Sequence, residues 1–88
     1  MYKIVFTRSA FKEYQKLPKA IKLKTDEALS LLAINPLSDL IKIKKIQGKS
    51  NHYRIRVADY RIIYTPLFDQ LLIEVIRVGH RRDIYRYF

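Results

Sequence analysis

The alternation of apolar and basic side chains in residues 53–64 most constrains what this chain can fold into. Read as a β-hairpin with a two-residue loop at Ala58 and Asp59, this segment places Arg56 opposite Arg61. Successive side chains of a strand point to opposite faces of a sheet, so six apolar residues share one face and three arginines share the other. The predicted core face holds Tyr53, Ile55, Val57, Tyr60, Ile62 and Tyr64, and the basic face holds Arg54, Arg56 and Arg61.

The chain before residue 38 has a different period. Its apolar residues recur at spacings of three and four, which predicts two helices. Thr7 is predicted to cap the first helix, and Pro18 ends it. The second helix begins at residue 18 or 19 and ends near Ile34, since the residue before Pro36 is pushed out of the α region. The predicted core-facing residues of these antiparallel helices are Ala10, Phe11, Tyr14, Leu17, Ile21, Ala28, Leu29, Leu32 and Ala33.

Extended segments make up most of the rest. β-branched and aromatic residues gather after residue 38, which favours strands there, and the opening apolar segment predicts another. The predicted strands are 2–6, 42–46 (approximate), 53–57, 60–65 and 71–78, with a turn at Gly48 and a loop at 66–70. Residues 80–87 are predicted to form one or two helical turns. The chain is therefore expected to be an α+β protein.

Length and charge limit the class of protein. With 88 residues the chain is shorter than the usual domain of ~100–150 residues, so one domain over residues 1–88 is expected. A hydrophobic content of 49% excludes a disordered basic tail. The formal charge of +10 favours a polyanionic partner. No stretch has the length of a signal peptide or a membrane helix, so we expect a cytoplasmic protein without a membrane role.

The hairpin arginines favour binding of an anion. Like charges directly opposite each other destabilise a sheet, so the fold gains nothing from Arg56 beside Arg61. A guanidinium presents a planar fork that matches phosphate oxygens. A solvated surface is the ordinary alternative for any single arginine. Arg54 and Arg56, together with Lys44 and Lys45 of the preceding strand, are taken as phosphate-binding residues.

Cleavage of a bound phosphodiester would also need groups that transfer protons. His80 follows the last predicted strand, among basic residues that favour its uncharged form, which can accept a proton. If this segment is helical, Arg81 and Tyr85 lie on one face at i, i+4, so Tyr85 could donate a hydrogen bond or a proton there. A surface histidine and a tyrosine at the edge of the core are the ordinary alternatives.

The sequence predicts no metal site and no cofactor. It has no cysteine, its eight acidic residues are scattered, and no glycine-rich phosphate loop is present. A site of Arg, His and Tyr fits a metal-independent ribonuclease mechanism in which the RNA 2′-OH attacks its own phosphate. The substrate would have to be RNA, because DNA lacks that hydroxyl.

Several short segments occur in a distinctive order and spacing. They are Phe6-Thr7, Lys16-Leu17-Pro18, Asn35-Pro36, Ile46-Gln47-Gly48, Tyr53–Val57, Asp59–Tyr64 and Val78–Tyr85. Together they resemble the RelE/ParE superfamily of bacterial and archaeal toxins over essentially the whole chain. The resemblance implies two N-terminal helices packed on a small twisted, mostly antiparallel sheet, with a short C-terminal helical turn.

The resemblance also implies a function. RelE-like members are toxins of type II toxin-antitoxin systems that cleave mRNA in the ribosomal A site, so the ribosome and mRNA are expected partners. A cognate antitoxin, expected to be a small acidic protein, would neutralise the toxin. The best-known RelE pattern has Lys where this chain has Arg54 and Arg56. Because Lys loses a proton far more readily than Arg, the general-base role moves to His80. The family's site residues map onto Arg54, Arg56, Arg61, Arg81 and Tyr85.

Two alternatives stay open. One is a ParE-type toxin that binds DNA gyrase and has no nuclease site, and the other is a non-enzymatic basic RNA-binding protein. Because both toxin branches share the hairpin segments, the residues that favour the nuclease are His80, Arg81 and Tyr85. Ala58 stands where the family commonly has Gly, so the predicted two-residue loop lacks the residue that favours such a turn.

Overall fold

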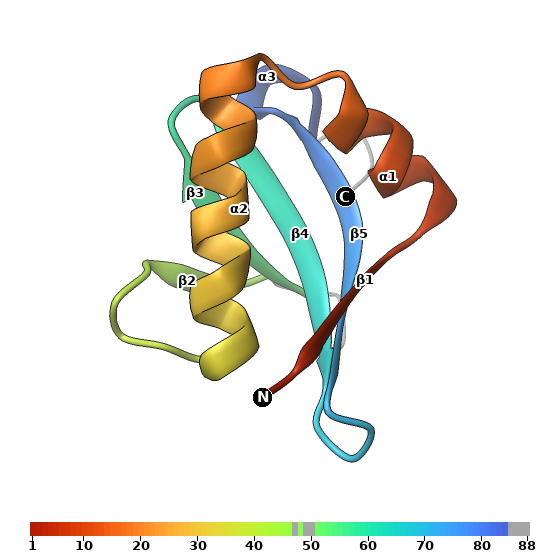
Figure 1. Ribbon diagram of the computed structural model, residues 1–88, viewed down its shortest axis with the longest axis vertical. Helices are drawn as coiled ribbons and strands as arrows, with labels where there is room; N and C mark the ends of the chain where they lie inside the picture. The colour runs from red at the N-terminus through yellow and green to blue at the C-terminus, as the bar shows by residue number, and fades with distance from the viewer. Residues whose placement is uncertain (47, 49–50, 85–88) are drawn as a thin grey trace.

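A five-stranded sheet with two helices on one face forms the protein (Figure 1). The structure is a computed structural model that describes residues 1–46, 48 and 51–84. The elements are β1 (Lys3–Phe6), α1 (Arg8–Gln15), α2 (Lys19–Ile34), β2 (Ile43–Lys45), β3 (Tyr53–Val57), β4 (Tyr60–Leu67), β5 (Leu72–His80) and α3 (Arg81–Ile84). The strand order is β1-β5-β4-β3-β2, and only the β1–β5 pair is parallel. The predicted α+β, mostly antiparallel architecture is confirmed.

Both predicted helices form where their caps place them. The Thr7 hydroxyl accepts a hydrogen bond from the Ala10 N–H at 3.1 Å and donates one to the Ile76 carbonyl at 3.2 Å, so it caps α1 and ties it to β5. The Tyr14 hydroxyl donates to the Asp26 carboxylate, which joins α1 to α2. In the described residues no helix has the length and apolar character needed to cross a membrane.

The core lies between the helices and the apolar face of the sheet. Its buried members from the helices and their connection include Ala10, Leu17, Leu29 and Leu32, as predicted. Phe11 differs from the prediction, because its side chain is 46% exposed and contacts the Phe6 ring at the edge of the core. The buried sheet members are Ile55, Val57, Ile62, Tyr64, Ile73, Val75 and Val78.

The β3–β4 hairpin has the predicted register. Val57 pairs with Tyr60 and Arg56 pairs with Arg61, so the loop contains two residues. Ala58 adopts a φ of +53° in this loop, which is the left-handed region that glycine enters most easily. The chain therefore makes the tight turn without glycine, and Ala58 carries the backbone strain.

The predicted loop at 66–70 is wrong at its start, because β4 continues to Leu67. Pro66 pairs with Ile73 of β5, but it lies beyond Tyr64, the last residue of β4 that pairs with β3. Its missing N–H therefore costs no hydrogen bond to β3, and proline is tolerated there. The last strand also runs two residues further than predicted, to His80.

Helix α1 covers the part of β5 that β1 leaves open. β1 pairs with residues 72–75 only, and Glu13 of α1 takes over beyond that point. One Glu13 carboxylate oxygen accepts the Val78 N–H at 3.0 Å, and the other forms an ion pair with Arg77 at 3.0 Å. The Glu13 side chain thus accepts a hydrogen bond from the edge of β5, the strand that leads to α3.

Candidate functional site: a basic hollow on the sheet

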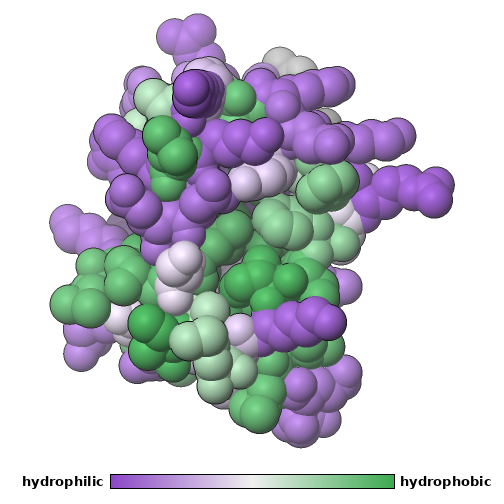
Figure 2. Space-filling model, viewed as in Figure 1, coloured by the Kyte–Doolittle hydropathy of each residue, from purple (hydrophilic) through white to green (hydrophobic). Residues whose placement is uncertain are grey.

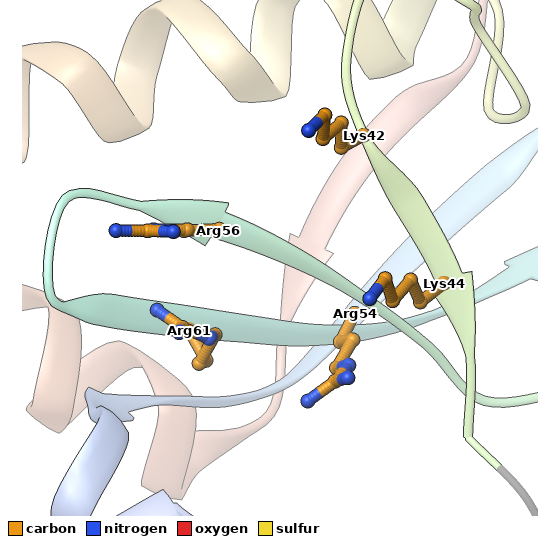
Figure 3. A pocket seen from close by; sticks show the side chains of 5 residues that line it. All are labelled: Lys42, Lys44, Arg54, Arg56 and Arg61. Carbon is orange, nitrogen blue, oxygen red and sulfur yellow. The ribbon is translucent and has the colours of Figure 1, made fainter.

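Five cationic side chains from three adjacent strands line a hollow on the sheet face that carries the arginines (Figure 3). They are Lys42, just before β2, Lys44 of β2, Arg54 and Arg56 of β3, and Arg61 of β4. The pleat of each strand explains the grouping, because the apolar neighbours of these residues face the core. The structure thus brings together Arg54, Arg56, Arg61 and Lys44, four of the residues predicted from the sequence.

The hollow contains two pairs of like charges held opposite each other. Arg56 is the cross-strand partner of Arg61, and Lys44 is the cross-strand partner of Arg54. Such pairs destabilise a sheet by roughly 0.2–1 kcal/mol each relative to neutral pairs. In the described part of the chain, no carboxylate forms an ion pair with Arg56 or Arg61. A bound anion would offset the repulsion that the fold leaves in place.

The strained turn holds the two hairpin arginines. Arg56 Nε donates to the Ala58 carbonyl at 3.1 Å, and Arg61 Nη1 lies 3.4 Å from the same oxygen. Arg61 Nη1 also donates to the Tyr60 carbonyl at 3.0 Å. The two guanidinium groups are therefore positioned side by side before any ligand arrives, which lowers the entropy lost on binding.

Arg61 is the electrostatic centre of the cluster. Partial burial lowers the pKa of its guanidinium, and the positive charges of Arg56, Arg54 and Arg81 lower that pKa further, while Asp59 acts in the opposite direction. The group stays positively charged at physiological pH. Because Arg81 acts on Arg61, the structure places the predicted residue after β5 within electrostatic reach of the hairpin.

The loop that holds Arg61 also holds the start of α3. The Arg81 N–H donates to the Asp59 carbonyl at 2.7 Å, so the hairpin turn fixes the backbone of Arg81. Gly79 allows α3 to fold back closely, because a Cβ at this position would lie 3.3 Å from Ile84 Cδ1. The helical turn predicted after β5 is observed for Arg81–Ile84. Tyr85 lies outside the described residues.

His80 lies on the other face of the sheet. Its register partner is Tyr60, whose ring meets the imidazole edge-on with centroids 5.4 Å apart. The imidazole Nδ1 accepts the Arg82 N–H at 3.2 Å, as a capping side chain does at the start of a helix. The structure therefore separates His80 from the arginines and gives its ring a role in holding α3.

The lysines are also sorted by the pleat. Lys45 pairs with Tyr53 and lines a separate hollow with Asp39 and Ile41, so it is not brought together with Lys44. Lys42, which sequence reasoning missed, lies on the pocket side instead. The signal that could have found it is the alternation Lys42-Ile43-Lys44, in which the middle residue packs against the core.

The residues described by the structure offer no group of three or more His, Cys, Asp or Glu side chains that could hold a metal ion.

The fold and the hollow define a small α+β protein with a strongly cationic sheet face. The family model described as "ParE toxin of type II toxin-antitoxin system, parDE" matches residues 4–85. Toxin RelE3 of Methanocaldococcus jannaschii is 38% identical over 90 residues, which cover 98% of each chain. The chain therefore belongs to the RelE/ParE superfamily of type II toxin-antitoxin toxins, and it is a RelE-like toxin.

Solved structures agree with this assignment. A chain in the crystal structure of the RelB-RelE antitoxin-toxin complex from Methanococcus jannaschii is 35% identical, with a TM-score of 0.79 over 96% of this chain and 98% of that one. The archaeal RelE-RelB complex from Pyrococcus horikoshii contains a chain that is 26% identical, with a TM-score of 0.79 over 93% and 97% of the two chains. The resemblance inferred from the sequence motifs is confirmed.

Proposed function

We propose that this toxin is a ribosome-dependent endoribonuclease that cleaves mRNA and thereby inhibits translation. The observation that carries the proposal is the cluster of Arg54, Arg56 and Arg61, in which the turn holds Arg56 and Arg61 and also fixes the backbone of Arg81. The resemblance to RelE-like toxins supports the reaction class, and the cationic cluster supports the binding of a phosphodiester.

The proposed reaction needs no metal. The RNA 2′-oxygen forms a bond to the adjacent phosphorus, the bond to the 5′-oxygen breaks, and a 2′,3′-cyclic phosphate and a 5′-hydroxyl result. Negative charge accumulates on the phosphate oxygens in the transition state, where preorganised donors act most strongly. Arg54, Arg56 and Arg61 would hold the backbone of the mRNA, and Arg81 would stabilise the charge on the scissile phosphate.

The proposed reaction also needs a group that accepts the proton of the 2′-OH and one that donates a proton to the leaving 5′-oxygen. The geometry supports His80 as a positioning residue for Arg81, because its Nδ1 is occupied by the Arg82 N–H and its ring packs against Tyr60. Tyr85 remains the candidate donor for the leaving 5′-oxygen, on the strength of the family resemblance alone. Any base for the 2′-OH would then come from outside the described residues or from the ribosome.

A cognate antitoxin is the proposed protein partner, together with the ribosome and mRNA. The solved relative from M. jannaschii is an antitoxin-toxin complex, and the one from P. horikoshii is a RelE-RelB complex. Apolar side chains gather over the C-terminal end of α2 and the neighbouring N-terminal strand (Figure 2). Exposed apolar residues of the protein include Ile34, Leu37, Leu40, Phe68 and Leu71. A partner that covered them would stabilise the native state.

Primer extension on mRNA in a translating extract tests the nuclease. Wild-type protein should produce new, codon-phased 5′ ends, and Arg81→Ala should reduce their yield by about 10²-fold, as expected for loss of one transition-state donor. Lys24→Ala, an equal change in charge at an exposed site on α2, should leave the yield unchanged. Absence of new 5′ ends at concentrations of toxin that inhibit translation would sink the proposal.

A second candidate is a toxin that inhibits DNA gyrase, which the ParE name of the matching family model favours. This activity would slow gyrase supercoiling without producing new mRNA 5′ ends, so a supercoiling assay beside the extract separates the two. A non-enzymatic RNA-binding protein would produce neither new mRNA 5′ ends nor slower supercoiling.

A further inference from the structure

We propose that Lys42 and Lys44 form a second phosphate-binding subsite, next to the one formed by Arg56 and Arg61, so that the hollow holds two successive phosphates of one RNA strand. The inference rests on the proposed nuclease function, and it assigns the path of the RNA strand across the sheet. The strand would cross the sheet from β4 over β3 to β2. Lys42, at the β2 end, then becomes a binding residue for RNA.

The pleat of β2 directs both lysines into the hollow. Ile43, which separates them, pairs with Ile55 and packs against the core. Because side chains alternate along a strand, Lys42 and Lys44 both project from the opposite face, where the arginines lie. Lys45 provides the contrast, since its position one residue further places it at the separate hollow beside Tyr53.

The hollow has two cationic ends. Arg56 of β3 and Arg61 of β4 lie beside each other near the hairpin turn, whereas Lys42 and Lys44 lie on the β2 side of β3 (Figure 3). Neighbouring strands lie about 4.8 Å apart, so β2 is about 7 Å from the midpoint between β3 and β4, where Arg56 and Arg61 lie. A single phosphate can neutralise one end only. A polynucleotide carries an anion on each side of every sugar and can neutralise both.

The two ends differ in how firmly their donors are held. The arginines of the turn share the Ala58 carbonyl and are prepositioned. Lys42 and Lys44 are exposed, and neither forms a hydrogen bond or an ion pair within the described part of the chain. The arginine end therefore suits the reacting phosphate, and the lysine end suits uniform binding of its neighbour. Binding of this kind affects KM more than kcat.

The salt dependence of RNA binding tests the subsite directly. The probe is a labelled 2′-O-methyl oligouridylate, which lacks the attacking hydroxyl, titrated at several salt concentrations. For single strands, log K falls with log salt by about 0.7 per neutralised phosphate. The double variant Lys42→Gln/Lys44→Gln should therefore lower the slope by about 0.7. The control Lys19→Gln/Lys24→Gln removes the same charge from exposed positions on α2 and should lower it much less.

A ligand with one phosphate provides the second measurement. Uridine 5′-monophosphate should bind the wild type and the Lys42→Gln/Lys44→Gln variant equally, because the arginine end is intact in both. Equal slopes for the two double variants, or an equal loss of mononucleotide and oligonucleotide binding, would overturn the second subsite. So would the absence of saturable oligonucleotide binding by the wild type.

These outcomes are separate from the fate of the proposed nuclease, because the binding experiment involves no cleavage. In the translating extract, the same double variant should need a higher concentration for half-maximal cleavage and should cut at the same codon positions. Circular dichroism of both double variants checks that the fold is unchanged, as expected for exposed side chains.

Discussion

Replacement of Ala58 by glycine should stabilise the protein, although glycine usually weakens regular structure. Ala58 has a φ of +53°, where a Cβ crowds the following carbonyl oxygen. This conformation costs an L-residue roughly 1–2 kcal/mol. Glycine removes the cost but makes the unfolded chain more flexible, which destabilises by about 0.4–1 kcal/mol. The difference gives a net stabilisation of about 0.5–1 kcal/mol.

Urea denaturation with linear extrapolation measures this change. For a domain of this size, ~1 kcal/mol corresponds to a shift in Tm of about 4–8 °C, so thermal denaturation also resolves it. The matched control is Ala20→Gly, at an exposed position of α2. There the backbone is helical, and the same substitution should lower the free energy of unfolding by about 0.5 kcal/mol.

Glycine is required to raise the free energy of unfolding at position 58 and to lower it at position 20. If Ala58→Gly left the free energy of unfolding unchanged or lowered it, while Ala20→Gly lost the expected amount, the strain attributed to the turn would be refuted. Because the substitution keeps the Ala58 carbonyl, the hydrogen bonds from Arg56 and Arg61 should persist, and RNA binding should stay at the wild-type level.

Three further substitutions test other contacts. The hydrogen bond to Asp26 is the chief cause that raises the Tyr14 pKa from 10.0 to about 12. The stabilisation by this bond should therefore be complete below pH 10 and be lost as the pH rises from 10 to 12. Tyr14→Phe should abolish this part of the pH dependence of the urea midpoint. Glu13→Ala removes the acceptor of the Val78 N–H and the ion pair with Arg77, and it should cost about 1–3 kcal/mol in urea denaturation, whereas Glu13→Gln should cost less. His80→Ala should loosen α3 and weaken the cleavage measured by primer extension. His80→Asn can still accept the Arg82 N–H and should restore part of the activity. An equal loss of cleavage in both variants would contradict the capping role.

The hairpin was predictable because its alternation admits one register. A shift of one residue would place Arg54 and Arg56 in the core and Ile55 in solvent, so the energetic penalty fixes both the pairing and the arginine cluster. The starts of the two helices were also predictable, since the Thr7 side chain caps α1 and the fixed φ of Pro18 suits the start of α2.

Other parts of the site depended on contacts that a linear pattern does not contain. The short strand β2 joins β3 through a longer connection than a tight hairpin, so its register with β3 was unconstrained and Lys45 was grouped with Lys44. The C-terminal end of β5 was predicted two residues too early, so the pairing of His80 with Tyr60 could not be foreseen. The hydrogen bonds to the Ala58 carbonyl arise only once the turn has formed.

The parallel pair of β1 and β5 also determines the order in which the chain can assemble during synthesis. β1 and the Thr7 cap find their partners at residues 72–76, nearly the full length of the chain away, whereas β3 and β4 meet across two residues. On a ribosome, the arginine hairpin can therefore form early, but the N-terminal strand stays unpaired until β5 has been made. The hydrogen bonds that anchor Arg81 and α3 belong to the same last stage. A growing toxin chain thus lacks its complete site until synthesis has passed β5.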